Sequence, residues 1–153
     1  RSKSRKIRYL SKLLDDLIVS DNIEINQEKG KNFLSKTIPS ISIHDYLERI
    51  IKYTKIEDTT LIIALIYIDR ICEVGIELNM FNIHRLLFTS ILIAVKYHED
   101  DIYLNDYYGK VAGIALQEIN KLEKEFLDLI FFNLFVNEEE FNGYADYIEK
   151  INE

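Results

Sequence analysis

Two apolar stretches, LIIALIYIDR at Leu61–Arg70 and ILIAVKYHEDD at Ile91–Asp101, decide the fold of this chain. Each stretch is apolar almost all the way round a helix, and each ends in charged residues. A helix without a polar face must be covered by other elements on all sides. Both stretches fall short of the about 18 apolar residues that indicate a membrane span. The sequence therefore predicts an all-α domain with these two helices at its centre.

Helical periodicity and capping residues predict the surrounding elements. Ser42, followed by Asp45, opens one helix, and Asn137 opens the last one in the same way. Asp58–Thr60 supplies the N-cap ahead of LIIALIYIDR, and Gly113 ends a short Tyr-rich helix. Residues 21–38 have no helical period and predict a loop. The predicted helices cover about 5–19, 42–55, 58–75, 82–98, 103–113, 116–130 and 137–150.

Length and composition are typical of one folded domain. The chain has 153 residues, of which 48% are hydrophobic, with five Gly and one Pro. Cys72 is the single cysteine, so a disulfide within the chain is excluded. Its apolar neighbours predict a small buried thiol. No signal peptide or transmembrane stretch is visible, which favours a nuclear or cytoplasmic protein without membrane contact.

Charge is distributed unevenly along the chain. Six of the 19 basic residues fall within residues 1–12, where there is no acid, so the rest has 13 basic against 26 acidic residues. An acidic body disfavours nucleic acid, because phosphate contacts require clustered Lys and Arg. The basic start is a solvated helix face, a nuclear-import signal or a contact to a kinase, and the sequence leaves these open.

The sequence offers no set of residues suited to catalysis. His44, His84 and His98 are scattered and lack the spacing of a helix-borne zinc site. The glycines form no phosphate-binding loop. The acidic run at Glu138–Glu140 is explained by a helix start, where negative charge favours the helix dipole. We therefore expect no enzyme activity, no cofactor, no metal and no small-molecule substrate.

Four longer motifs stand out: SISIHDYLERIIKYTKI (40–56), ALIYIDRI (64–71), NIHRLLFTSILIAVKYHEDDIYLNDYYGKVAGI (82–114) and LQEINKLEKEFLDLIFFNLFV (116–136). They resemble the cyclin box, the helical module that binds and activates cyclin-dependent kinases. They are closest to the phosphate-regulon group, also called P- or U-type cyclins. The resemblance covers about residues 38–150 and implies a five-helix cyclin box over 39–153, preceded by an extra N-terminal helix and loop over 1–38.

The resemblance implies a contact to the region of the kinase C-helix. At positions matching Lys96 and Glu123, cyclins bind the kinase backbone through a lysine and a glutamate. An ammonium donates to carbonyls and a carboxylate accepts from N–H groups, so both bonds are charge-assisted. Without the resemblance, Lys96 would be an ordinary cation at a helix end and Glu123 a surface charge. The apolar part of the kinase-binding site corresponds to Ile93, Tyr97, Leu127, Phe132 and Leu134.

The chain departs from mitotic and S-phase cyclins at PSISI, residues 39–43, where those cyclins carry an MRAIL-type motif. A groove for RxL peptides is therefore not expected. In those cyclins the arginine of this motif pairs with the aspartate that matches Asp69, but Ser40 stands at the arginine position. Arg49 is the candidate replacement partner for Asp69. Ala115, at a position often occupied by Ser in the subgroup, predicts a weaker N-cap for the helix that follows.

The resemblance implies a non-catalytic regulatory subunit of a cyclin-dependent kinase, acting in the cell cycle or in phosphate signalling. Two alternatives stay open at this point. One is a cyclin-fold scaffold without a kinase partner, and the other is a transcription-factor-like interaction module, which the acidic body disfavours.

Overall fold

The computed structural model describes residues 2–18 and 29–150, with side chains from Ile7 onward. Over these ranges the chain is all-α, which confirms the predicted fold class, and they contain no strand. The elements are α1 (Ser2–Leu17), the 3-10 helix η1 (Lys31–Phe33), α2 (Ile43–Thr54), α3 (Asp58–Glu73), α4 (Ile83–His98), α5 (Asn105–Ala112), α6 (Leu116–Leu129) and α7 (Glu138–Lys150).

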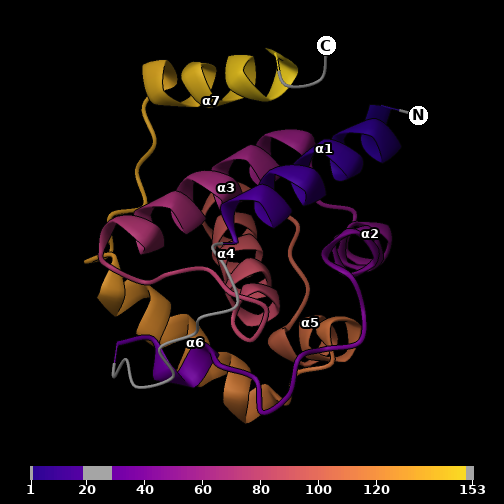
Figure 1. Ribbon diagram of the computed structural model, residues 1–153, viewed down its shortest axis with the longest axis vertical. Helices are drawn as coiled ribbons and strands as arrows, with labels where there is room; N and C mark the ends of the chain where they lie inside the picture. Colours follow the sequence, from indigo (N-terminus) through magenta and orange to yellow (C-terminus); the bar gives the residue numbers. More distant parts are fainter. Residues whose placement is uncertain (1, 19–28, 151–153) are drawn as a thin grey trace.

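Helices α3 and α4 form the centre of the domain, as the two apolar stretches predicted. Every residue from 60 to 68 is buried, and so is every residue from 83 to 95 except Arg85. Figure 1 shows α4 running through the middle of the molecule, with α2, α5 and α6 around it and α1 beside α3. Fully burying one Leu or Ile side chain contributes about 1.5–3 kcal/mol. This pair of helices therefore provides much of the apolar burial that stabilises the fold.

The N-terminal segment joins the same core. Helix α1 contacts α2 and buries Ile7, Leu10 and Leu14. The predicted loop at 21–38 contains η1, whose Phe33 is fully buried and meets the ring of Phe126 edge-on at 6.1 Å. Residues 19–28 of this region lie outside the described residues. The predicted division of the chain at residue 38 stays a prediction.

Most predicted helix ends are confirmed. The Asp45 N–H donates to Ser42 Oγ at 3.0 Å, and the Glu140 N–H donates to Asn137 Oδ1 at 2.7 Å. Each bond satisfies a backbone donor that the first turn of a helix leaves free. Gly113 ends α5 with φ 73°, a left-handed conformation that favours glycine.

Two other helix starts lack a side-chain cap. The N-cap of α3 is Glu57, without a side-chain hydrogen bond, and Asp58 is the first helical residue, so the predicted Asp58–Thr60 cap is wrong. Burial of nearly the whole helix stabilises α3 without it. Ala115 is the N-cap of α6 and makes no side-chain bond, as expected. Within the described ranges, no helix is both long and apolar enough to cross a membrane.

Candidate functional site

Lys96 and Glu123, 27 residues apart in the sequence, form one ion pair, which we call the charged pair. Lys96 Nζ, near the end of α4, lies 3.0 Å from each carboxylate oxygen of Glu123 on α6. The two side chains are 29% and 19% exposed. In a partly exposed pair each charge neutralises the other, yet solvent and other groups still reach both.

The charged pair has a polar neighbour that the sequence did not single out. Asn105, the first residue of α5, donates from Nδ2 to Asn120 Oδ1 at 3.0 Å and lies 3.4 Å from Glu123 Oε1. Its own Oδ1 is buried and has no hydrogen-bond partner. The position of Asn105 within the LNDYY stretch was the available signal. Asn105 thus fixes one side of the Glu123 carboxylate and keeps an acceptor free beside it.

The five apolar residues implied by the resemblance fall into two groups. Tyr97 and Phe132 are 53% and 61% exposed and are available for contact. Leu127 and Leu134 are partly buried, and Ile93 is 3% exposed within the core. Any contribution of Ile93 to binding therefore comes through packing beneath the surface.

Residues 130–135, which we call the aromatic turn, follow α6 directly. Phe131 and Phe135 are 84% and 69% exposed, and together with Phe132 they give this turn three solvent-facing rings. Sequence reasoning missed Phe131 and Phe135. The repeated aromatics of FFNLF were the only signal, and they are equally compatible with a buried segment.

Two side chains of the YIDR motif in α3 donate hydrogen bonds to backbone carbonyls of the aromatic turn. The Tyr67 hydroxyl donates to the Leu134 carbonyl at 2.7 Å. The Arg70 guanidinium donates to the Asn133 carbonyl at 2.5 Å and to the Phe135 carbonyl at 2.9 Å. A third Arg70 bond, of 2.9 Å, reaches Glu140 on α7.

The predicted pairing of Asp69 with Arg49 is wrong. Asp69 accepts a hydrogen bond from the Tyr144 hydroxyl of α7. Arg49 donates from Nε to the Val111 carbonyl at 2.6 Å, and its guanidinium lies 5.7 Å from the Tyr53 ring centroid. The two residues separate because α2 packs against α5, whereas this side of α3 faces α7 (Figure 1). Burial, and then the bond to Asp69, raise the pKa of Tyr144.

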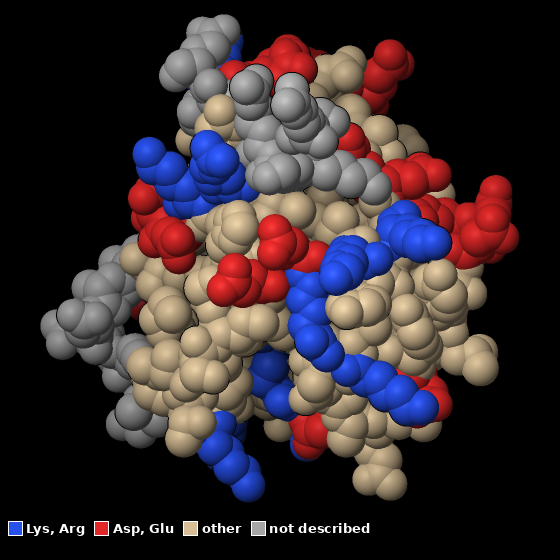
Figure 2. Space-filling model, turned by 90° about the vertical axis from the view of Figure 1, so that its right-hand side faces the viewer, with Lys and Arg blue, Asp and Glu red and all other residues tan. Residues whose placement is uncertain are grey.

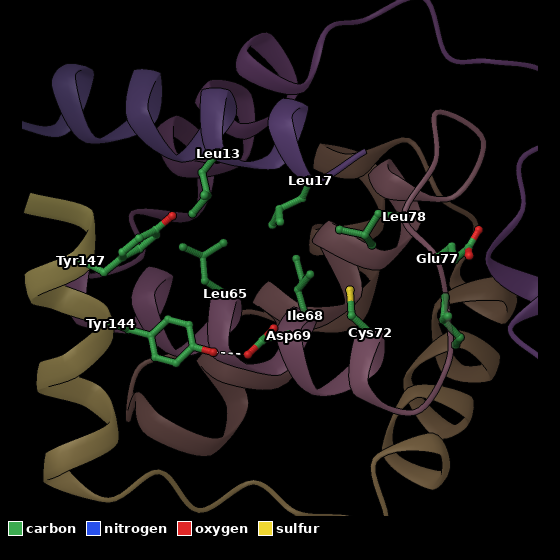
Figure 3. Close-up of a pocket in the computed structure, with 11 residues that line it drawn as sticks. Leu13, Leu17, Leu65, Ile68, Asp69, Cys72, Glu77, Leu78, Tyr144 and Tyr147 are labelled. Atoms are coloured by element: carbon green, nitrogen blue, oxygen red, sulfur yellow. Dashed lines mark hydrogen bonds between the residues drawn. The ribbon is translucent and has the colours of Figure 1, made fainter. Parts of the chain in front are cut away.

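An apolar cavity of about 390 Å³ lies between α1, α3 and α7 (Figure 3). Its walls include Leu13, Leu65 and Tyr147, and the Asp69–Tyr144 bond lies at one side. Cys72 faces this cavity and is only partly buried, which corrects the predicted buried thiol. Burial and the nearby Asp69 and Glu73 raise its pKa to about 11, so the thiol stays protonated at neutral pH.

The histidines stand apart in the structure as they do in the sequence. His84 Nε2 contacts the Ile41 carbonyl at 2.8 Å, His98 Nε2 lies 3.0 Å from the Tyr67 hydroxyl, and His44 lies beside Asp45. Among the described residues, no group of three or more His, Cys, Asp or Glu could hold a metal ion.

Charged side chains are mixed on the face shown in Figure 2, the side on which α2 and α5 lie in Figure 1. Lys and Arg form a narrow stripe across this face, with Asp and Glu next to it. Nucleic-acid binding is supported by a broad basic surface. On this face the Lys and Arg side chains form only a narrow stripe, and acidic side chains lie next to it.

Comparison with known proteins assigns most of the chain to one family. A family model described as Cyclin matches residues 9–134. Cyclin-U2-1 of Arabidopsis thaliana is 43% identical over 124 residues, covering 80% of this chain and 56% of its own. Cyclin-U4-1 of the same plant is 37% identical over 153 residues, covering 96% and 76%. PHO85 cyclin-like protein psl1 of Schizosaccharomyces pombe is 40% identical over 136 residues, covering 84% and 56%. Against Cyclin-U2-1 and psl1, the chain spans a little over half of the relative's length.

Proposed function

This chain belongs to the cyclin family, and we propose that it is a non-catalytic subunit that binds and activates a cyclin-dependent protein kinase. The U-type and P-type names among its relatives agree with the predicted subgroup. One relative is named PHO85 cyclin-like protein psl1. That name supports a kinase of the PHO85 type as the partner. A role in phosphate signalling or the cell cycle is what the resemblance to the subgroup implies.

The charged pair is the observation that carries the proposal. Lys96 and Glu123 each keep part of their surface in solvent, and the residue after Lys96 is an exposed aromatic, Tyr97. Because water reaches both side chains, screening weakens their attraction, so a partner can replace the pair at a reduced cost. Kinase carbonyls would then bind the ammonium and kinase N–H groups the carboxylate, each through a charge-assisted bond.

Activation follows from holding the kinase C-helix in one position. In protein kinases a lysine–glutamate pair formed by this helix must be in place before phosphoryl transfer, and an ordered activation loop is also required. Apolar contacts from Tyr97 and Phe132 would supply affinity, because exposed aromatics at an interface contribute most of the binding energy. The chain itself supplies no group to the reaction.

We propose residues 39–153 as the cyclin box and residues 1–38 as an added helix and loop, in a nuclear or cytoplasmic protein. The expected absence of RxL docking has local support. Ser42 is engaged in capping α2, and Ile43 is 3% exposed. Fluorescence polarisation with a labelled RxL peptide is therefore expected to show no binding. Micromolar binding that substitution of Ser40 or Ile43 abolishes would contradict this.

The function is tested by calorimetry, which measures the affinity of a PHO85-type kinase for the unmodified chain and for variants of the charged pair. Truncating one side of a desolvated charge contact costs about 2–5 kcal/mol. Lys96→Ala and Glu123→Ala should weaken binding by that amount while the free protein stays folded. Lys110→Ala is the matched control, because Lys110 forms an exposed pair with Asp106 on α5.

Each outcome separates the proposal from its alternatives. Affinity within twofold of the unmodified chain would refute the role of the charged pair. Failure of the unmodified chain to bind any cyclin-dependent kinase would favour a cyclin-fold scaffold. A mobility shift with promoter DNA would instead favour the transcription-factor-like module.

A further inference from the structure

The aromatic turn has a backbone conformation that non-glycine residues avoid. Phe131 and Phe132 have φ 56° and φ 55°, both left-handed. In this region the side chain of an L-residue crowds its own carbonyl, so each position costs free energy. Strained residues of this kind persist only where the surroundings over-determine them, and they gather at functional sites.

Backbone bonds within the turn account for part of this conformation. The Phe132 N–H donates to the Leu127 carbonyl at 2.8 Å, and the Phe131 N–H donates to the Asp128 carbonyl at 3.1 Å. These bonds end α6 but leave the carbonyls of the following residues without a helix partner. Two more backbone bonds lie inside the turn, from the Asn133 N–H to the Ile130 carbonyl and from the Leu134 N–H to the Phe132 carbonyl, both at 3.0 Å. The carbonyls of residues 133–135 are bound by side chains of another element.

Arg70 supplies two of these bonds from α3. Its side chain is 12% exposed, and two of its nitrogens bond the Asn133 and Phe135 carbonyls at 2.5 and 2.9 Å. A guanidinium holds two acceptors in a fixed geometry, which a lysine cannot reproduce. One side chain thereby fixes the path of the turn over three residues, with Phe135 at its end.

Tyr67 connects the turn to the end of α4. Its hydroxyl donates to the Leu134 carbonyl and lies 3.0 Å from His98 Nε2. The His98 ring packs edge-on against Tyr97 with centroids 4.8 Å apart. Tyr97, the residue after Lys96, is therefore linked to the aromatic turn by successive contacts through His98 and Tyr67.

We propose that Tyr67 and Arg70 are positioning residues that hold the aromatic turn in its strained form, so that Phe131 and Phe135 extend the kinase-binding surface beyond Tyr97 and Phe132. This inference rests on the proposed function. The partner surface is a set of apolar side chains on the same kinase. Three of the five residues 131–135 carry exposed rings, apolar groups gathered in one exposed segment mark protein contacts, and the turn includes Phe132 and Leu134 of the proposed interface.

The first experiment tests the rings directly by calorimetry with the kinase that the unmodified chain binds. Phe131→Ala and Phe135→Ala each remove a side chain that is mostly in solvent, so the free protein should keep its melting temperature. Each should lower affinity about tenfold, as interface aromatics commonly do. Tyr147→Ala is the matched control, because Tyr147 is 52% exposed on α7 and far from the turn in sequence.

The second experiment tests the positioning residues. Arg70→Lys keeps the charge but loses the paired bonds to the turn, and Tyr67→Phe loses only a hydroxyl. Both should lower kinase affinity about tenfold and speed amide hydrogen exchange at residues 131–135 in the free protein. Glu140→Gln removes the ion pair between Arg70 and α7 but spares the turn, so its affinity and its exchange at 131–135 should match the unmodified chain.

The outcomes distinguish this inference from the proposed function. If Lys96→Ala weakens binding while Phe131→Ala and Phe135→Ala stay within twofold of the unmodified chain, the function stands and the extended surface is wrong. If the ring variants weaken binding but Arg70→Lys and Tyr67→Phe leave exchange at 131–135 unchanged, the positioning role is wrong. If the unmodified chain binds no kinase, both the function and the inference are overturned.

Discussion

The centre of the fold, formed by α3 and α4, buries its apolar residues. The charged pair and the aromatic turn form a second region, which we call the edge, and this region exposes them. In the centre, Ile66 and Leu86 are fully buried and stabilise the fold. At the edge, Phe131 and Phe132 are exposed on a left-handed backbone, a conformation that costs free energy in an L-residue. Packing within the chain does not account for this exposure, and for that reason we propose that the edge contacts a partner.

The largest expected effect lies in the centre. Ile66→Ala should lower the free energy of unfolding by about 2–5 kcal/mol, since it leaves a cavity in a close-packed core. Phe131→Ala should change it by about 0.5 kcal/mol or less, because the ring is mostly in solvent. Urea titration of both variants measures the difference. If the two variants lose the same free energy of unfolding, the predicted difference between centre and edge is wrong.

A pH titration compares a histidine of each region. Burial lowers the pKa of His84 and of His98 below the ordinary value of 6.5, and the bond to the Ile41 carbonyl partly opposes this at His84. The unfolded chain therefore takes up these protons first as the pH falls. The contribution of these histidines to the free energy of unfolding should therefore be complete above about pH 6.5. It should be lost as the pH falls through their lower folded pKa values.

The two histidines should differ in the size of this effect. His84 is 3% exposed, and its Nδ1 is buried without a hydrogen-bond partner, whereas His98 is exposed. His84→Gln should therefore flatten the fall in melting temperature between pH 8 and pH 5 more than His98→Gln does. The predicted difference is wrong if the melting temperatures of both variants fall between pH 8 and pH 5 as much as that of the unmodified chain.

A gain of stability is expected where α6 begins. Ala115 is its N-cap and makes no side-chain bond. Ala115→Ser should stabilise the protein by about 1 kcal/mol, because a hydroxyl can accept from a free N–H of the first turn. Thermal unfolding measures this, with kinase affinity expected to stay unchanged. A lower melting temperature would show that the site lacks room for the hydroxyl.

The smallest expected effect concerns the charged pair in the free protein. A double-mutant cycle of Lys96→Ala and Glu123→Ala should give a coupling energy of less than about 1 kcal/mol in the absence of kinase. The pair is partly exposed, so solvent screening reduces its contribution. A coupling of several kcal/mol would mean that the pair serves the fold, and the distinction between centre and edge would fail at this point.

Local sequence signals determined the helices of this chain. The apolar runs identified α3 and α4, and Ser42 and Asn137 marked the starts of α2 and α7. The resemblance of the motifs singled out Lys96 and Glu123 as kinase contacts, but their bond to each other came only with the structure. Periodicity and capping act within a few residues, so the chain itself carries this information.

Only the tertiary structure decided which groups meet. Phe33 lies in a segment predicted as a loop, yet it is fully buried against Phe126. Asp69 bonds Tyr144 in place of the predicted Arg49, and the left-handed backbone of Phe131 has no signature in the sequence. A periodic pattern reports that one face of a helix is buried, but the partner of each side chain depends on how whole helices pack against each other.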